Sequence, residues 1–468
     1  MKTFKQENKI YFSILSFLSY VSLTFCIIKN DFTDFKITIL SFIFISVILF
    51  TTYYSIIKNQ IRSYPINIFF NLYFLISFLV FLYNFDYISN FTYESMFSAI
   101  KKEDLYYITL EAIKLLLFTV IFLNLGFIIV EKILKKKNFN FLPNLSELDL
   151  IRLTFFLLII KLLFISSNFF FHINIKELED PITLLIASIS FYLLLFNKKN
   201  YFIFLVILFY IFFENAITTY SIYKNTILLL VFFILTYNYK KKISLVIFSI
   251  LIIWVVLGQS YKVPIRSIHM VNNNNEISKS MINEILEDIQ ENDALKKFDG
   301  NPVVLRLSEP IISLMRVLEF EKIKSKNIHK DTLSILFYSP IPRFILKDKP
   351  TQNFAYWYTD YFFDVYQFKE FDFTKTVTYN IFWPSDFYIN FGIFGNTIFA
   401  LVFGIFISFF LLILANFNSN NIQFLLGISI FSSLSLPDYN LSLMLSPILL
   451  QYLIIFSLIK LILKFIKK

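Results

Sequence analysis

Long apolar runs alternate along the chain with short polar clusters. The runs are continuously apolar and show no period of two, which favours membrane helices over the strands of a barrel. Most approach the roughly 20 residues that a helix needs to cross a bilayer, although the seventh and eighth are shorter. The pattern therefore predicts about twelve spans. They are placed at residues 10–28, 37–57, 66–84, 106–130, 151–171, 181–197, 201–213, 225–238, 243–258, 391–415, 421–436 and 443–463.

One long polar segment interrupts this series. It divides the chain into spans one to nine (1–258), a large loop (259–390) and spans ten to twelve (391–468). Within the loop, Glu276–Lys297 carries apolar residues at spacings of four, which predicts an amphipathic surface helix. A second helix is expected from Val303 to Lys326. The loop is thus expected to be partly helical.

Positive charge sets the expected orientation. Alternate loops hold Lys clusters such as 135–137 and 240–242, whereas the short loops between them hold far fewer cations. Cytoplasmic loops carry an excess of Lys and Arg, so both termini are expected inside and the large loop outside. No small-residue cleavage site follows the first apolar run, which we interpret as an uncleaved span.

Composition narrows the class of protein. Of the 468 residues, 57% are hydrophobic and 16% are charged, against about a quarter charged in soluble domains. The net charge of +10 lies largely between spans, so we expect no nucleic-acid partner. A single Cys26 excludes a disulfide framework, and His172, His269 and His329 lack the spacing of metal ligands. The sequence has no Gly-rich phosphate loop, and we expect neither a metal nor another cofactor.

A proline-rich stretch of the loop, residues 339–350, contains Arg343 and Lys349. Prolines restrict the backbone and favour a rigid turn. An Arg fork binds phosphate oxygens in pairs and Lys adds a point charge, so the stretch fits capture of a pyrophosphate group above the bilayer. A structural turn whose cations meet anionic lipid is an equally good interpretation.

Asp386 stands where the loop runs into the tenth span. A carboxylate poised between water and hydrocarbon would suit a general base for a sugar hydroxyl. The alternative is a structural carboxylate favoured by the positive end of the helix dipole, with Gly392 and Gly395 permitting close helix packing. On the residues alone, the structural interpretation is the stronger one.

Charged residues inside spans are costly and therefore count as functional candidates. Glu111 and Lys114 lie three apart on one helical face, so we expect them to pair, mainly for structure. Lys161 lies near the middle of the fifth span. It would approach either a phosphate group or a carboxylate from another helix. Glu214, at the outer end of a short span, is left without an assignment.

Two motifs together resemble a known family. The pattern Ile-Pro-Arg-x5-Lys-Pro at 341–350 precedes acidic-x-Tyr-x-Asn-Phe-Gly-x-x-Gly at 386–395. Both motifs, and the layout with one large late loop, resemble the Wzy-type O-antigen polymerases, the oligosaccharide repeat unit polymerases of the bacterial envelope. The resemblance implies a metal-independent glycosyltransferase with a GT-C-like, all-α polytopic fold in the bacterial inner membrane. It would polymerise undecaprenyl-pyrophosphate-linked repeat units into O-antigen of lipopolysaccharide or capsule-type polysaccharide. Donor and acceptor would both be lipid-linked glycans, with membrane lipid and a chain-length regulator as further partners.

The resemblance also implies a site. Arg343, Lys349 and Asp386 match the motifs, and Arg316 stands where an Arg commonly precedes the Pro-Arg segment. Lys224 stands where family members often have an Arg. We expect Arg266, Arg316 and Arg343 to neutralise the leaving pyrophosphate and Asp386 to accept the hydroxyl proton. The residues expected to bind pyrophosphate or sugar are Arg266, Arg306, Lys349, Lys224, Lys161, Trp357, Tyr358, Tyr361 and Trp383. For each aromatic residue, a place in an interfacial belt is the alternative.

Other classes remain open. A different lipid-linked GT-C transferase would place acidic catalytic residues in the first outer loop, where Asp31 and Asp34 lie. An O-antigen ligase would differ in its acceptor. A flippase or transporter is expected to have compact loops and pseudo-symmetric halves, and the long loop counts against it.

Overall fold

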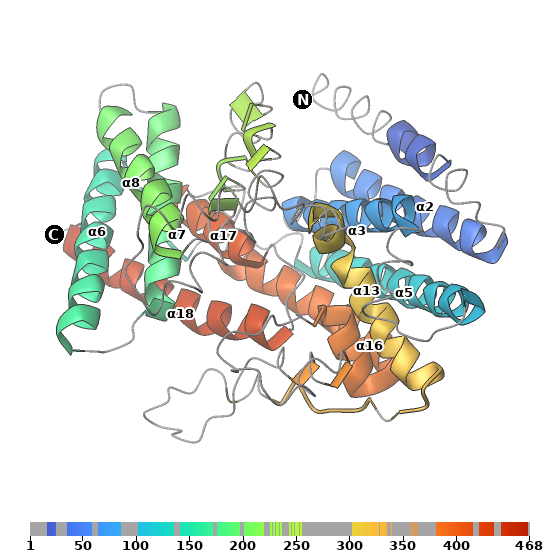
Figure 1. The fold of residues 1–468 in the computed structure, drawn as a ribbon. Helices are drawn as coiled ribbons and strands as arrows, with labels where there is room; N and C mark the ends of the chain where they lie inside the picture. Colours follow the sequence, from blue (N-terminus) through green and yellow to red (C-terminus); the bar gives the residue numbers. More distant parts are fainter. Residues whose placement is uncertain are drawn as a thin grey trace, which may run out of the picture.

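The computed structural model describes most of the predicted spans and part of the large loop (Figure 1). The described residues are 16–24, 35–58, 64–85, 102–134, 141–171, 176–196, 201–219, 302–326, 328–334, 381–414, 421–434 and 441–466, with scattered positions between 225 and 254 and at 338, 357–358 and 361–362. Within these ranges nearly every residue is helical and none lies in a β-strand. The prediction of an all-α chain is therefore confirmed for the described part.

Apart from α13, which lies in the large loop, the helices follow the predicted apolar runs. Their bounds are α2 Phe35–Lys58, α3 Tyr64–Tyr83, α5 Lys102–Leu134, α6 Glu147–Phe171, α7 Lys176–Phe196, α8 Tyr201–Thr219, α13 Pro302–Lys322, α16 Trp383–Leu414, α17 Asn421–Leu434 and α18 Leu441–Ile466.

Among the described residues, three segments are long and apolar enough to cross a membrane: Phe35–Tyr54, Asp104–Leu134 and Trp383–Phe410. Shorter apolar helices occupy Phe70–Tyr83, Pro181–Leu195 and Phe202–Glu214. The chain thus has several helices that fit a membrane. The number twelve stays a prediction.

The helices form two groups. One contains α2, α3, α5, α13 and α16, and the other contains α6, α7, α8, α17 and α18. Figure 1 shows the first group on the right and the second on the left, and α16 contacts α17 where they meet. α13 belongs to the large loop, yet it packs against α3, α5 and α16. The loop therefore contributes to the same core as the candidate spans.

Among the described helices, α5 and α16 share the most extensive contact, and two glycines permit their close approach. A Cβ atom on Gly126 would lie 2.5 Å from the carbonyl oxygen of Leu401, and one on Gly404 would be equally crowded by the backbone of Leu123. Small residues let helix backbones approach closely where lipid gives no hydrophobic drive. Farther along, Asn396 Nδ2 donates to Thr119 Oγ1 at 2.7 Å, which adds a polar contact between the same helices.

A buried amide pair joins α3 to α5. Asn71 and Asn124 donate to each other's side-chain oxygens at 3.2 and 3.0 Å, and Asn71 also donates to Thr51 of α2 at 3.0 Å. Polar groups inside an apolar bundle require such partners, because leaving them unpaired costs free energy. The pair therefore favours one alignment of the three helices.

α16 begins earlier than the apolar pattern predicts. The tenth span was placed from residue 391, but the helix starts at Trp383, and Gly392 interrupts it with φ 66° and ψ −163°. The polar residues before 391 made this part of the chain look like a loop. In the folded chain they are helical, buried and hydrogen-bonded. After the kink, Gly395 lies against Phe391, where a Cβ would collide with that side chain. The two motif glycines thus shape the kink.

α13 confirms the helix expected from Val303 to Lys326, although it ends at Lys322. Pro302 occupies its first position, where a missing N–H costs nothing. Backbone bonds from Ile323 and Lys324 to the carbonyl of Glu319 close its C-terminal end. The amphipathic helix expected at 276–297 lies outside the described residues.

Candidate functional site

A cluster of buried polar side chains lies where α13, residues 328–334, residues 357–362 and the start of α16 meet. We call it the polar cluster. Its fully or almost fully buried members are Ser313, Arg316, Glu319, Thr332, Tyr358, Ser385 and Asp386. Burying so many polar groups is costly unless they satisfy one another. Their contacts show how this chain does so.

Arg316 is held from two sides. Its Nε donates to the backbone oxygen of Phe362 at 2.5 Å, and its Nη1 donates to Oε2 of Glu319, one turn further along α13, at 2.5 Å. The other oxygen of Glu319 forms an ion pair with Lys324 Nζ at 2.9 Å. The guanidinium carbon also lies 4.9 Å from the ring centre of Phe320. These contacts fix the direction of the Arg316 fork.

Ser313 joins three segments of the cluster. Tyr358 OH donates to its Oγ at 2.9 Å and to its carbonyl oxygen at 3.1 Å. Its Oγ also lies 3.3 Å from that of Ser385, at the start of α16. The backbone N–H of Phe382 also donates to Ser313 Oγ, at 3.4 Å. Ser313 therefore ties residues 357–362 and α16 to α13.

Asp386 and Asn390 hold residues 328–334 against the first half of α16. The hydroxyl of Thr332 donates to Asp386 Oδ1, and the backbone N–H of Thr332 donates to Asn390 Oδ1 at 3.0 Å. Asn390 Nδ2 donates back to Thr332 Oγ1 at 2.6 Å. Because Asp386 and Asn390 are four residues apart, both side chains lie on one helical face. Asp386 is completely buried.

Two further contacts attach the same half of α16. His329 Nδ1 lies 3.0 Å from the carbonyl oxygen of Ile389, so that nitrogen must carry the donated proton. The neighbouring kink at Gly392 explains why this carbonyl needs a donor from outside the helix. Tyr388 donates its hydroxyl to Glu321 of α13. The acidic-x-Tyr-x-Asn-Phe-Gly motif therefore has a structural part for each of its polar residues.

An aromatic and cationic edge borders the cluster. Trp357 stacks on Tyr361 with ring centres 5.6 Å apart and planes at 21°, and both side chains are half-buried. Lys330 Nζ lies 4.3 Å from the ring centre of Trp357. Partial burial lowers the pKa of the Lys330 amine, because desolvation disfavours its charged form. Phe320 lies next in line, 5.8 Å from Tyr361.

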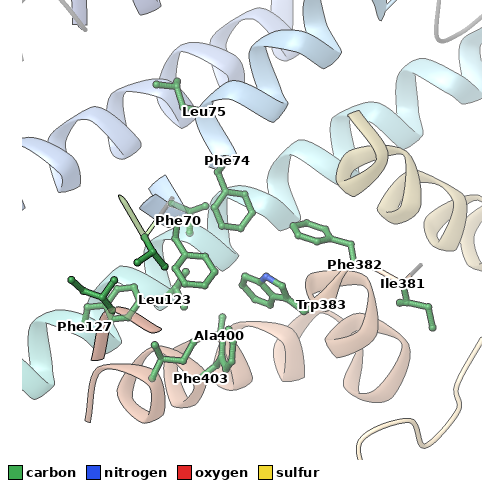
Figure 2. Close-up of a cluster of buried hydrophobic side chains, with 14 of the residues drawn as sticks. Phe70, Phe74, Leu75, Leu123, Phe127, Ile381, Phe382, Trp383, Ala400 and Phe403 are labelled. Carbon is green, nitrogen blue, oxygen red and sulfur yellow. The ribbon is translucent and has the colours of Figure 1, made fainter. Parts of the chain in front are cut away.

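Two aromatic residues predicted to stack on sugars are not placed for that role. Figure 2 shows the indole of Trp383 enclosed by Phe70, Phe74, Phe382 and Phe403. The side chain of Trp383 is completely buried, as is that of Tyr358, which contacts Ser313. Burial leaves no ring face open to a ligand, so we correct these two predictions: both residues form part of the core. Trp357 and Tyr361 keep partly open faces.

The charges predicted inside spans are paired. Lys161 of α6 forms a buried ion pair with Glu214 of α8, and its amine also lies 5.5 Å from the ring of Tyr210. Of the two partners considered for Lys161, the structure thus provides the carboxylate. Lys114 and Glu111 pair at 2.6 Å on α5, which confirms that prediction.

Several predicted site residues cannot be placed. Lys224, Arg266, Arg343 and Lys349 lie outside the described residues, as does the side chain of Arg306. Among the described residues, no three His, Cys, Asp or Glu side chains gather as metal ligands would.

Sequence reasoning missed several members of the cluster. The sequence patterns do not single out Glu319 and Thr332 as site residues, nor Lys324 and Lys330 at the edge of the cluster. One signal was present: Arg316 and Glu319 are three apart in a predicted helix, where opposite charges meet. No local pattern, however, connects Thr332 with Asp386, because these residues are far apart in the chain.

The arrangement combines an oriented Arg, buried carboxylates and an adjoining strip of rings and amines. Arg316 and the carboxylates are buried and paired with one another, so the part of this arrangement that is accessible to an anionic or sugar ligand is the adjoining strip. Comparison of the chain with family models, with curated proteins and with solved structures gave no match.

Proposed function

We propose that this protein is a membrane glycosyltransferase that polymerises oligosaccharide units carried on undecaprenyl pyrophosphate. The observation that carries the proposal is the fixed Arg316 fork in the polar cluster. It lies next to two half-buried rings, to the half-buried amine of Lys330 and to a helix that fits a membrane. A lipid-linked glycan offers the matching chemistry: an anionic pyrophosphate at the bilayer and sugar rings above it.

The proposed reaction needs no redox step. The bond between the anomeric carbon of the growing chain and its pyrophosphate oxygen breaks, and undecaprenyl pyrophosphate leaves with the electron pair. A hydroxyl of the incoming repeat unit forms the new bond to that carbon and releases its proton. Catalysis then requires cations at the leaving group and an acceptor for the proton.

Arg316 is proposed to stabilise the charge that develops on the pyrophosphate, together with Arg343 of the same loop. An Arg positioned by its surroundings stabilises this charge without rearranging during the reaction. Asp386 remains the proposed proton acceptor. Asp386 is completely buried and accepts a hydrogen bond from Thr332, so a substrate has to displace that contact to reach it. Variants of Asp386 and Thr332 test this role.

We also propose a topology for the protein. It has twelve spans in a GT-C-like arrangement in the bacterial inner membrane, with both termini cytoplasmic and the large loop in the periplasm. The Lys clusters between spans support this orientation. In this topology the polar cluster faces the side of the membrane on which repeat units are joined.

The surface polysaccharide of a deletion strain tests the proposal. The strain is complemented with the wild-type protein, with Arg316→Ala and with Arg152→Ala. Arg152 is a matched control because its half-exposed guanidinium lies 3.8 Å from an i−3 carboxylate in the other helix group. We expect the high-molecular-weight ladder to be restored by wild type and Arg152→Ala, while Arg316→Ala leaves single repeat units. Loss of even single units in the deletion strain would refute polymerisation and indicate a flippase, a ligase or an earlier transferase.

A further inference from the structure

The edge beside the polar cluster forms one continuous strip of rings and amines. Trp357, Tyr361 and Phe320 follow one another at ring-centre distances of 5.6 and 5.8 Å. Lys330 lies over the first ring, and Lys326 lies 5.0 Å from the centre of the last. We call these five residues the ring–amine strip. Phe320 is completely buried, so the partly exposed rings of the strip are those of Trp357 and Tyr361, with the two amines beside them.

The amines of this strip differ from the other cations near the cluster. Arg316 and Lys324 both meet the carboxylate of Glu319. Among the described residues, Lys326 and Lys330 contact rings and no carboxylate. Lys330 is half-buried, whereas Lys326 is exposed. A half-buried amine without an anionic neighbour has lost hydration that a ring only partly replaces, so an anionic ligand would gain mainly at Lys330.

The rings set the rest of the ligand's chemistry. Trp357 and Tyr361 stack on each other and are both half-buried, so their exposed parts offer an aromatic edge with polar tips that can hydrogen-bond the hydroxyl groups of a sugar. A simple phosphate would use the amines but not the rings. A neutral sugar would use the rings but leave the amines without partners.

We infer that the ring–amine strip binds an acidic sugar, one that carries a carboxylate, within the glycan. This inference rests on the proposed function and deepens it, because it assigns negatively charged repeat units to the same site. Lys330 is then a residue that determines specificity: its amine meets the carboxylate while the sugar packs beside Trp357 and Tyr361.

Binding of defined oligosaccharides to the full-length protein tests the inference. The protein is placed in nanodiscs of phosphatidylcholine, and binding is measured by isothermal titration calorimetry with trigalacturonate or with maltotriose, a neutral chain of equal length. We expect the acidic trisaccharide to bind roughly ten-fold more tightly, as befits one charge-assisted contact. Equal affinities would overturn the inference.

Two variants assign the preference to the strip. Lys330→Gln should reduce the preference for the acidic chain to near unity, whereas Trp357→Leu should weaken both ligands. Lys460→Gln is the matched control, because Lys460 lies 4.9 Å from the ring centre of Phe456 in a similar pair on α18. An unchanged preference in Lys330→Gln, at wild-type thermal stability, would also overturn the inference.

Three further outcomes separate the inference from competing explanations. If nanodiscs containing phosphatidylglycerol abolish trigalacturonate binding, the strip is a site for anionic lipid and the inference fails. If the deletion strain lacks its ladder but the polymer contains only neutral sugars, the proposed function stands and the inference fails. Acidic-chain binding in a protein whose deletion leaves the ladder intact would refute the proposed function while supporting the site.

Discussion

Arg316 and Glu319 form a completely internal ion pair on α13, with Nη1 and Oε2 2.5 Å apart. The same carboxylate also meets Lys324, so Glu319 joins two cations at the end of the helix. Buried ion pairs of this kind seldom increase net stability, because desolvation offsets the attraction. Their value lies in fixing the orientation of the charged groups, which is the property that a pyrophosphate site requires.

The first prediction separates the stability of this pair from its function. Glu319→Gln leaves Arg316 without its buried counter-charge and should lower the free energy of unfolding by about 3–5 kcal/mol. The double variant Arg316→Met with Glu319→Leu removes both charges and should recover most of that loss. Thermal unfolding in detergent measures both effects. If Arg316 acts on the pyrophosphate, the double variant folds but makes no ladder; a ladder from it would contradict that role.

The second prediction concerns Asp386. In Asp386→Asn the amide oxygen can still accept the hydrogen bond of Thr332, but the base is lost. Thr332→Val keeps the shape and removes the hydroxyl, which should cost about 1–3 kcal/mol because the carboxylate loses its donor. If Asp386 is the general base, Asp386→Asn should fold normally and fail to polymerise. Thr332→Val should be destabilised but active. Full activity of Asp386→Asn would leave Asp386 with a structural role alone.

The third prediction tests the close approach of α5 and α16. Gly404→Ala forces a methyl group against the backbone of Leu123 and should destabilise the protein by roughly 1–3 kcal/mol, because neither helix can yield alone. Ser408→Ala is the control one turn further along α16, since the Ser408 hydroxyl is buried and has no hydrogen-bond partner among the described residues. Ser408→Ala should be neutral or stabilising. The urea midpoints of unfolding of the two variants are compared, and equal midpoints would contradict the packing argument.

The fourth prediction treats Gly392 separately, because space is not limiting there. A Cβ on Gly392 would meet nothing within 4 Å, but its φ of 66° is unfavourable for L side chains. Gly392→Ala should therefore cost about 1–2 kcal/mol through backbone strain. Gly392→Asn should cost less, because Asn tolerates this region better. A larger loss for Asn than for Ala, measured by thermal unfolding, would show that sterics decide instead.

The fifth prediction addresses the ion pair between α6 and α8. Lys161→Gln or Glu214→Gln alone leaves a charge in an apolar bundle and should destabilise the protein by several kcal/mol, about 3–5. Replacing both with Gln should be milder, and a double-variant cycle of unfolding free energies measures the coupling. Since Lys161 lies in the other helix group, the ladder should persist in the double variant. Its loss would return Lys161 to the list of substrate-binding residues.

The local pattern of apolar residues was sufficient to locate several of the helices. Continuous apolar runs located α2, α3 and α5 to within a few residues, because length and hydropathy act along the chain without reference to distant partners. The spacing of Glu111 and Lys114 likewise predicted their pairing, since three residues in a helix bring side chains to one face. Arg316 was correctly placed on a helix of the loop.

Tertiary structure decided what these residues touch. The start of α16 was misplaced because Asp386 and Asn390 look like loop residues until Thr332, far away in sequence, satisfies them. Trp383 looked like an interfacial ring and is instead enclosed by aromatic residues of α3 and α16. Burial and hydrogen bonding between distant segments depend on how whole helices pack. A one-dimensional pattern carries helix period and length, but it does not carry that packing.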